Sequence, residues 1–170
     1  MSDDLLIGSD RTIGSIVRWA YECHAGAGST PPAAMFRLGA RISTGNREAS
    51  HFDYLTEAGW IMGIVERLPT EHIRCHVMAL YGYHCTARVR LIDLLTECAK
   101  CERQIADAII ADWIGKTARS VTRLASDCGL PRRESERQYH DGQGVLRGWD
   151  RLATEMLRVS FEGRGWLSDH

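Results

Sequence analysis

Residues 110–124 read IADWIGKTARSVTRL, and this stretch decides the predicted fold. Apolar residues recur at helical spacing on both sides of Gly115, which predicts two short helices at about 101–113 and 117–127. Glycine tolerates the positive φ of a tight turn, so we expect Gly115 to lie between the two helices. Thr117 stands where the second helix needs a side-chain cap for its free N–H groups.

The spacing also meets the packing needs of two helices that cross at a steep angle. Ala111, beside Ile110, supplies the small residue that the first helix needs where it faces its partner. Ile114 supplies a buried residue directly before the glycine. Val121 and Leu124, six and nine positions after the glycine, supply the core-facing residues of the second helix. The sequence therefore predicts a helix-turn-helix unit, and two ordinary core helices joined by a glycine turn are the alternative.

Residues 107–126 resemble the helix-turn-helix superfamily of DNA-binding proteins. The resemblance implies that the second helix enters the major groove, where arginine can bond guanine and a methyl group can meet thymine. From Lys116 to Ser126 the sequence has three cations and no anion. This cluster indicates either a DNA-reading face or a solvated surface. The residues expected to contact double-stranded DNA are Lys116, Thr117, Ala118, Arg119, Ser120, Thr122, Arg123 and Ser126.

The rest of the chain shows helical spacing and no alternating strand pattern, so the expected fold is all-α. Three regions are expected along the sequence. They are a helical region at 1–82 with a long loop near 26–50, the helix-turn-helix region at 83–129, and a long amphipathic helix with a tail at 130–170.

Capping residues and helix breakers predict where the other helices begin and end. The expected spans are 10–25 with Asp10 as N-cap, a short helix at most around 33–40, about 50–68, 70–81 with Thr70 as N-cap, and 86–97. A final helix is expected through 145–157; it could begin as early as Pro131, although Gly142 and Gly144 would weaken or bend it. The residues expected to face the core are Ile13, Ile16, Val17, Ala20, Tyr21, Tyr54, Ala58, Ile61, Met62, Val65, Ile73, Val77, Leu80, Val89, Leu91, Ile92, Leu94, Leu95, Val145, Leu146, Trp149, Leu152, Ala153, Met156 and Leu157.

Composition and charge place the chain among ordinary globular proteins. Hydrophobic residues make up 44% and charged residues 25% of its 170 residues, which excludes disorder throughout. No apolar run approaches the roughly 20 residues that a membrane helix needs, so no membrane partner is expected. The N-terminal MSDDLLIGSD lacks the basic region and apolar core of a signal peptide, and a cytoplasmic location is expected. Because the formal net charge is only −1, a nucleic-acid surface would require local segregation of charge.

The spacing of two cysteines is that of a possible metal site. Cys98 and Cys101 form a single CxxC, whereas structural zinc usually takes four ligands from two such pairs. A zinc ion at these two residues is therefore the alternative to buried thiols, and no cofactor is expected. The groups that could complete such a site are Cys23, His24, Cys75, His76, His84, Cys85 and Cys128.

The order of elements resembles that of a family of phage regulators. Residues 58–81 (AGWIMGIVERLPTEHIRCHVMALY), followed by a helix-turn-helix and a long final helix, resemble Q-type late-gene antiterminators and related prophage regulators. The resemblance implies binding to a DNA element at a late promoter, with RNA polymerase as a partner. The function expected is therefore that of a sequence-specific DNA-binding transcription regulator, and in particular of a phage antiterminator.

Two other classes of protein are alternatives to a DNA-binding regulator. A protein-binding inhibitor or interaction module could use segment 145–160 with Trp149, Phe161 and Trp166 as a partner or homodimer face, unless these aromatics pack on the core. An enzyme is not expected, because phosphate-binding and hydrolase motifs are absent from the sequence. His72 and His76, four residues apart, could share a metal, although two surface histidines are the commoner arrangement.

Overall fold

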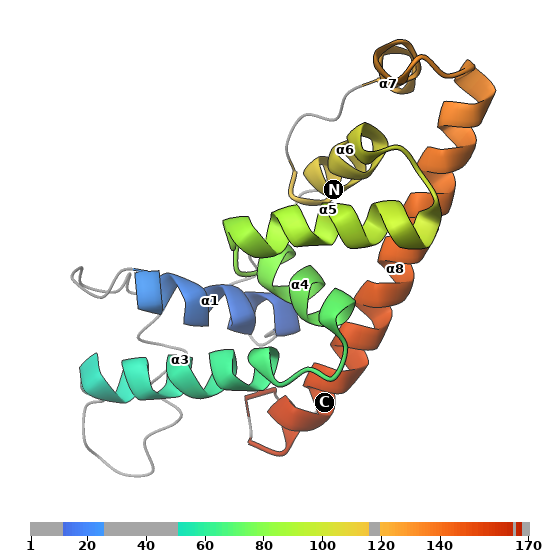
Figure 1. Ribbon diagram of the computed structural model, residues 1–170. Coiled ribbons are helices and arrows are strands. Elements are labelled where there is room, and N and C mark those ends of the chain that lie inside the picture. The colour runs from blue at the N-terminus through green and yellow to red at the C-terminus, as the bar shows by residue number, and fades with distance from the viewer. Residues whose placement is uncertain (1–11, 26–50, 116–119, 165, 168–170) are drawn as a thin grey trace. The chain divides into compact units, whose positions relative to one another are not determined.

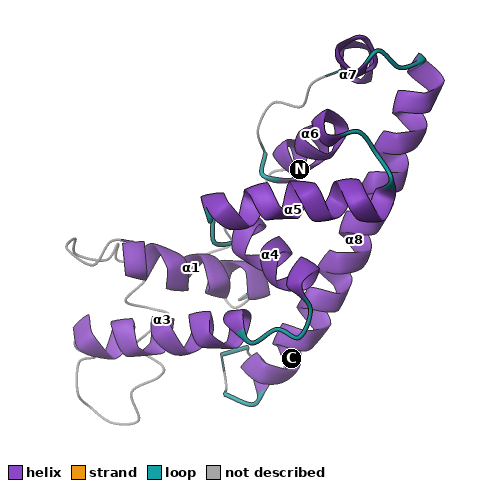
Figure 2. Cartoon of the chain, viewed as in Figure 1, coloured by secondary structure: helices purple, strands orange, loops and turns teal. Residues whose placement is uncertain are grey.

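A computed structural model describes residues 12–25, 51–115, 120–164 and 166–167, without the side chains of 51–54. Every regular element among these residues is a helix (Figure 2), which confirms the all-α prediction. The elements are α1 (Ile13–Ala25), α3 (His51–Glu66), α4 (Glu71–Leu80), α5 (Cys85–Ala99), α6 (Arg103–Trp113), α7 (Val121–Cys128) and α8 (Arg132–Glu162). Within the described ranges, none of these helices is long and apolar enough to span a bilayer. The expected loop near 26–50, with its short helix, lies outside the described residues.

The chain forms two compact units. Unit 1 comprises Met1–Arg67 and Glu155–His170, and unit 2 comprises Leu68–Thr154. This grouping differs from the three regions expected from the sequence. Those regions ended at glycines that stop helices, whereas membership of a unit depends on which distant segments pack together.

Unit 1 contains α1 and α3, which lie side by side (Figure 1). Ile16 and Val17 of α1 and Ile61 and Val65 of α3 are almost fully buried, as predicted from their spacing. Near the start of α1, the Oγ1 atom of Thr12 accepts a hydrogen bond from the Ser15 N–H at 3.2 Å. The predicted cap, Asp10, lies outside the described residues.

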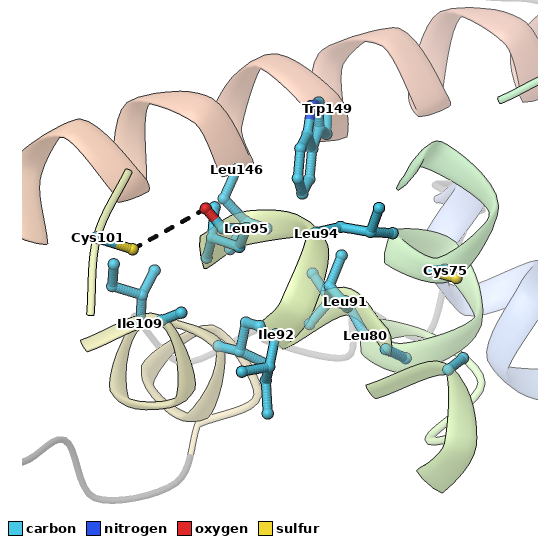
Figure 3. Packing of buried hydrophobic residues seen from close by; sticks show 14 of the residues in the cluster. Cys75, Leu80, Leu91, Ile92, Leu94, Leu95, Cys101, Ile109, Leu146 and Trp149 are labelled. Carbon is cyan, nitrogen blue, oxygen red and sulfur yellow. Dashed lines mark hydrogen bonds between the residues drawn. The ribbon is translucent and has the colours of Figure 1, made fainter. Parts of the chain in front are cut away.

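Unit 2 is built around one hydrophobic cluster (Figure 3). Leu91, Leu94 and Leu95 of α5 form its centre, and Leu146 and Trp149 of α8 point toward them from above. The cluster also holds Cys75, Ala79, Leu80, Ala87, Ile92, Cys101, Ile105, Ala106, Ile109 and Ile110. Most of the core predicted for this part of the chain is therefore confirmed.

Two predicted core residues are wrong. Val89 is 52% exposed and Leu152 is 44% exposed. The buried face of α5 is centred near Leu91, and Val89 lies about 200° around the helix from it. Leu152 lies about 100° from its neighbour Ala153, which belongs to the buried stripe of α8. Val89 therefore lies on the face of α5 opposite the core, and Leu152 lies on the flank of the buried stripe of α8.

Helix α8 runs unbroken for 31 residues through Gly142 and Gly144. Gly142 is buried against α6, where a Cβ would come within 2.5 Å of Ile109 Cδ1. Gly144 has open space around its Cα. The helix is therefore continuous at both glycines, and Gly142 allows close packing against α6.

Candidate nucleic-acid interface

The turn after α6 has the geometry that the sequence predicts. Gly115 adopts φ +74°, and its N–H donates to the Asp112 carbonyl at 3.0 Å. A Cβ at this position would meet no described atom within 4 Å. The left-handed backbone conformation, rather than lack of space, therefore favours glycine here. Ile110 is buried, and Ala111 and Ile114 are partly buried.

The second helix begins later than predicted. Ser120 is extended, with φ −61° and ψ 142°, and its side chain accepts a hydrogen bond from the Arg123 N–H. Ser120 is thus the N-cap of α7, three residues beyond the predicted cap Thr117, which itself lies outside the described residues. Serine and threonine both cap helices well, so the sequence offered two competent caps three residues apart.

Helix α7 separates a buried face from an exposed one. Leu124 and Ala125 are buried, whereas Thr122, Arg123 and Ser126 are exposed. Ser120 is exposed just before the helix, and Val121 is only partly buried, in contrast to its predicted core position. Of the remaining expected contacts, Lys116, Thr117, Ala118 and Arg119 lie outside the described residues.

An acidic residue borders this exposed face. Asp127 lies one turn beyond Arg123 and is also exposed. Among the ion pairs formed by described residues, none joins these two side chains. The guanidinium of Arg123 therefore projects from α7 with an acid nearby. Asp127 directly follows the segment from Lys116 to Ser126, which contains three cations and no anion.

The C-terminal end of α7 is fixed by a glycine cap. Gly129 adopts φ 64°, and its N–H is bonded to the carbonyls of Ala125 and Ser126. The N–H of Leu130 donates to the same Ala125 carbonyl at 2.9 Å. The left-handed glycine satisfies carbonyls that the helix leaves free and turns the chain toward α8, as the sequence predicted.

Polar contacts across unit 2 hold α6, the helix before the turn. The side chain of Gln138, on α8, accepts from the Glu102 N–H at 2.9 Å and so caps the start of α6. Tyr139 donates to Asp112 at 3.2 Å, and Arg88 of α5 donates to Asp107 at 2.8 Å. These contacts join residues that are far apart in sequence, and sequence spacing gave no sign of them.

A second polar group lies deeper in unit 2. His76 is fully buried, and its Nε2 lies 3.0 Å from Asp150 Oδ1. Tyr81 donates to the same oxygen at 2.7 Å. Burial alone would raise the pKa of Asp150, but the hydrogen bonds from His76 and Tyr81 keep that pKa below its ordinary value. His72 contacts the ring of Trp149 instead, with centroids 5.0 Å apart, so the two histidines have different partners.

The cysteines of the CxxC differ in their surroundings. Cys98 is exposed, while Cys101 is buried and its Sγ lies 3.9 Å from the Leu95 carbonyl (Figure 3). Burial raises the pKa of the Cys101 thiol to about 11 and so disfavours the thiolate that a metal needs. In the described part of the chain, no group of three His, Cys, Asp or Glu side chains could hold a metal ion.

The aromatic residues of the C-terminal segment pack inside their own units. Trp149, Phe161 and Trp166 are all buried. Phe161 and Trp166 meet edge to face, with ring centroids 5.3 Å apart. These three side chains therefore pack in the core, which was the alternative expected for them.

Comparisons with known proteins give no relative. No protein-family model, no curated protein sequence and no solved structure matches this chain.

Proposed function

We propose that this protein binds double-stranded DNA through α7 and regulates transcription. The observation that carries the proposal is the division of α7 into a buried face and an exposed face that presents Thr122, Arg123 and Ser126. One arginine and two hydroxyl groups on adjacent turns can donate to base edges and phosphates.

The position of α7 in unit 2 supports the proposal. Ser120 and Gly129 fix its two ends, and Leu124 anchors its inner face. A short, rigid helix with a polar outer face meets the requirement that a reading element be held by its scaffold. In the proposal, Lys116 and Arg119 add positive charge before the helix and contact phosphates or bases.

The effect on transcription rests on the resemblance in sequence layout to late-gene antiterminators. That resemblance makes RNA polymerase a proposed partner and antitermination the proposed activity. A homodimer is a further proposal, since helix-turn-helix proteins commonly read two half-sites.

Selection from a random duplex library tests the proposal. The purified protein is incubated with the library at a fixed, stated salt concentration, because phosphate contacts make affinity depend on salt. Bound DNA is recovered and sequenced over successive rounds. We expect one enriched motif, and its duplex should bind more tightly than a shuffled sequence. Recovery of unenriched DNA at every round would contradict sequence-specific binding and would favour the protein-binding module.

A further inference from the structure

Unit 1 has an exposed aromatic side chain with an arginine stacked on it. Trp60 of α3 is 53% exposed. The guanidinium carbon of Arg164 lies 5.0 Å from the centroid of the Trp60 ring and 5.5 Å from that of Trp166. Arg164 thus covers part of the Trp60 indole, and much of that ring still faces solvent.

A second arginine lies on the same side of α3. Trp60 and Gly63 are three residues apart, which places them on one face of α3, and Arg67 directly follows the last residue of that helix. The guanidinium of Arg67 turns back over Gly63, because a Cβ built on that glycine would lie 3.7 Å from Arg67 Nη2. Gly59 has nothing described within 4 Å of such a Cβ. We call Trp60, Gly63, Arg67 and Arg164 the Trp60 surface.

Two acids of α3 lie near this surface. Glu57 is buried, and burial raises its pKa, while the hydrogen bond that its carboxylate accepts from the Trp166 indole N–H and the charge of Arg164 lower that pKa. Glu66 acts on Tyr21 of α1, whose pKa burial and this charge raise to about 12. Glu66 is adjacent to Arg67 in sequence, a spacing at which two helical side chains do not face each other. The Trp60 surface therefore combines an exposed indole with two guanidinium groups. Glu57 partly offsets the charge of Arg164, and none of the ion pairs among the described residues includes Arg67.

We propose that the Trp60 surface binds single-stranded nucleic acid. An exposed indole can stack on a nucleobase of any sequence, and guanidinium groups beside it can contact the phosphates that flank that base. Complementarity of charge favours this ligand over an uncharged apolar partner. The surface belongs to unit 1 and uses no residue of α7, so it is a site separate from the proposed duplex interface.

Binding of a fluorescein-labelled oligo-dT, followed by fluorescence anisotropy and by quenching of tryptophan emission, tests this inference. Trp60→Ala should weaken binding by about tenfold, the scale of one lost base–aromatic stack. Trp60→Phe should retain most of the affinity, since a ring remains. Arg67→Ala should lower the slope of log affinity against log salt by about 0.7, the value for one phosphate of a single strand.

Matched control variants test whether a loss of oligo-dT binding is specific to the Trp60 surface. Val159→Ala removes another exposed apolar side chain of unit 1, and Arg158→Ala removes another exposed arginine; both should leave oligo-dT binding unchanged. Arg67→Glu keeps Trp60 in place, so it tests the inference even if Trp60→Ala unfolds the protein, and it should abolish binding. Unchanged affinity of Arg67→Glu, or displacement of oligo-dT by polyglutamate of equal charge, would overturn the inference. Arg123→Ala should not change oligo-dT binding, so failure here is distinguishable from failure of the duplex proposal.

Discussion

The buried imidazole of His76 on α4 is hydrogen bonded to the carboxylate of Asp150 on α8, 74 residues away in sequence. The Nε2 atom donates, because an ionised carboxylate can only accept. Tyr81 donates to the same oxygen, so two donors from the α4 region meet one acceptor on α8. The Nδ1 atom of His76 is buried and has no described partner. The contact therefore fixes the orientation of the ring and joins two helices of unit 2.

Removal of this carboxylate should destabilise unit 2. In Asp150→Ala, the Nε2–H of His76 and the hydroxyl of Tyr81 lose their acceptor, and the loss should be about 1–3 kcal/mol for a buried unsatisfied group. Urea denaturation, with the free energy of unfolding from linear extrapolation, measures the effect. Asp141→Ala is the control, because Asp141 is exposed and its nearest cation is 4.0 Å away. Equal destabilisation by both substitutions would argue against a special role for the His76–Asp150 contact.

The lowered pKa of Asp150 predicts how the stability of the folded protein depends on pH. Because the folded-state pKa of Asp150 is lowered, its contribution is fully present above the unfolded-state pKa of about 3.9 and is lost as pH falls through the folded value. Glu57 acts in the opposite direction, since burial raises its pKa. The comparison to make is therefore between the wild type and Asp150→Asn. Between about pH 5 and pH 3 the wild type should lose more stability than the variant. Parallel pH curves would contradict this prediction.

Substitution by alanine should change the stability in opposite directions at two glycines of α8. Gly144→Ala should stabilise the helix by up to about 1 kcal/mol, because the site is open and alanine favours helix. Gly142→Ala should be less stable than Gly144→Ala by about 1–3 kcal/mol, since its Cβ would press on the buried Ile109 side chain. Thermal unfolding of the two variants measures this difference. Ile109→Val should partly rescue Gly142→Ala by removing the Cδ1 atom, and no difference between the two alanine variants would show that α6 moves aside freely.

The start of α7 can be located by substitution of its cap. Ser120→Ala should cost about 1 kcal/mol, because the Arg123 N–H loses its side-chain acceptor, and Ser120→Asp should restore the stability. Thr117→Ala is the matched substitution at the cap that the sequence predicted. Chemical denaturation of the three variants compares them. A larger loss from Thr117→Ala than from Ser120→Ala would place the helix start at Thr117.

The helices were largely predictable because their signals are local. Periodic apolar residues revealed the helical segments, and Gly115 and Gly129 marked turns that do adopt positive φ. Val89 was misplaced because it lies three residues before the buried Ile92, a spacing that places two residues on the same side of a helix. The sequence also could not determine whether Thr117 or Ser120 caps the second helix, since both residue types cap helices.

The polar contacts could not be predicted because they depend on tertiary packing. Nothing in the sequence around His76 indicates that its partner is Asp150, and Gln138 gives no sign that it caps α6. The exposed face of α7 was predictable in part, as Thr122, Arg123 and Ser126 lie opposite Leu124. For the Trp60 surface, the spacing of Trp60 and Arg67 was visible in the sequence, but the stacking of Arg164 was not.

The affinity of Arg123→Ala for the selected duplex tests the central claim most directly. If Arg123 bonds a guanine edge, the variant should lose about 1–3 kcal/mol of binding free energy and relax preference at one base position. If it contacts a phosphate, affinity should fall for all sequences and the salt slope should fall by about one unit. Arg147→Ala, an exposed arginine of α8 that bonds only Gln143 among described residues, is the control and should bind like the wild type. Unchanged duplex affinity and salt slope for Arg123→Ala at matched salt would contradict the assignment of α7 as the DNA-reading helix.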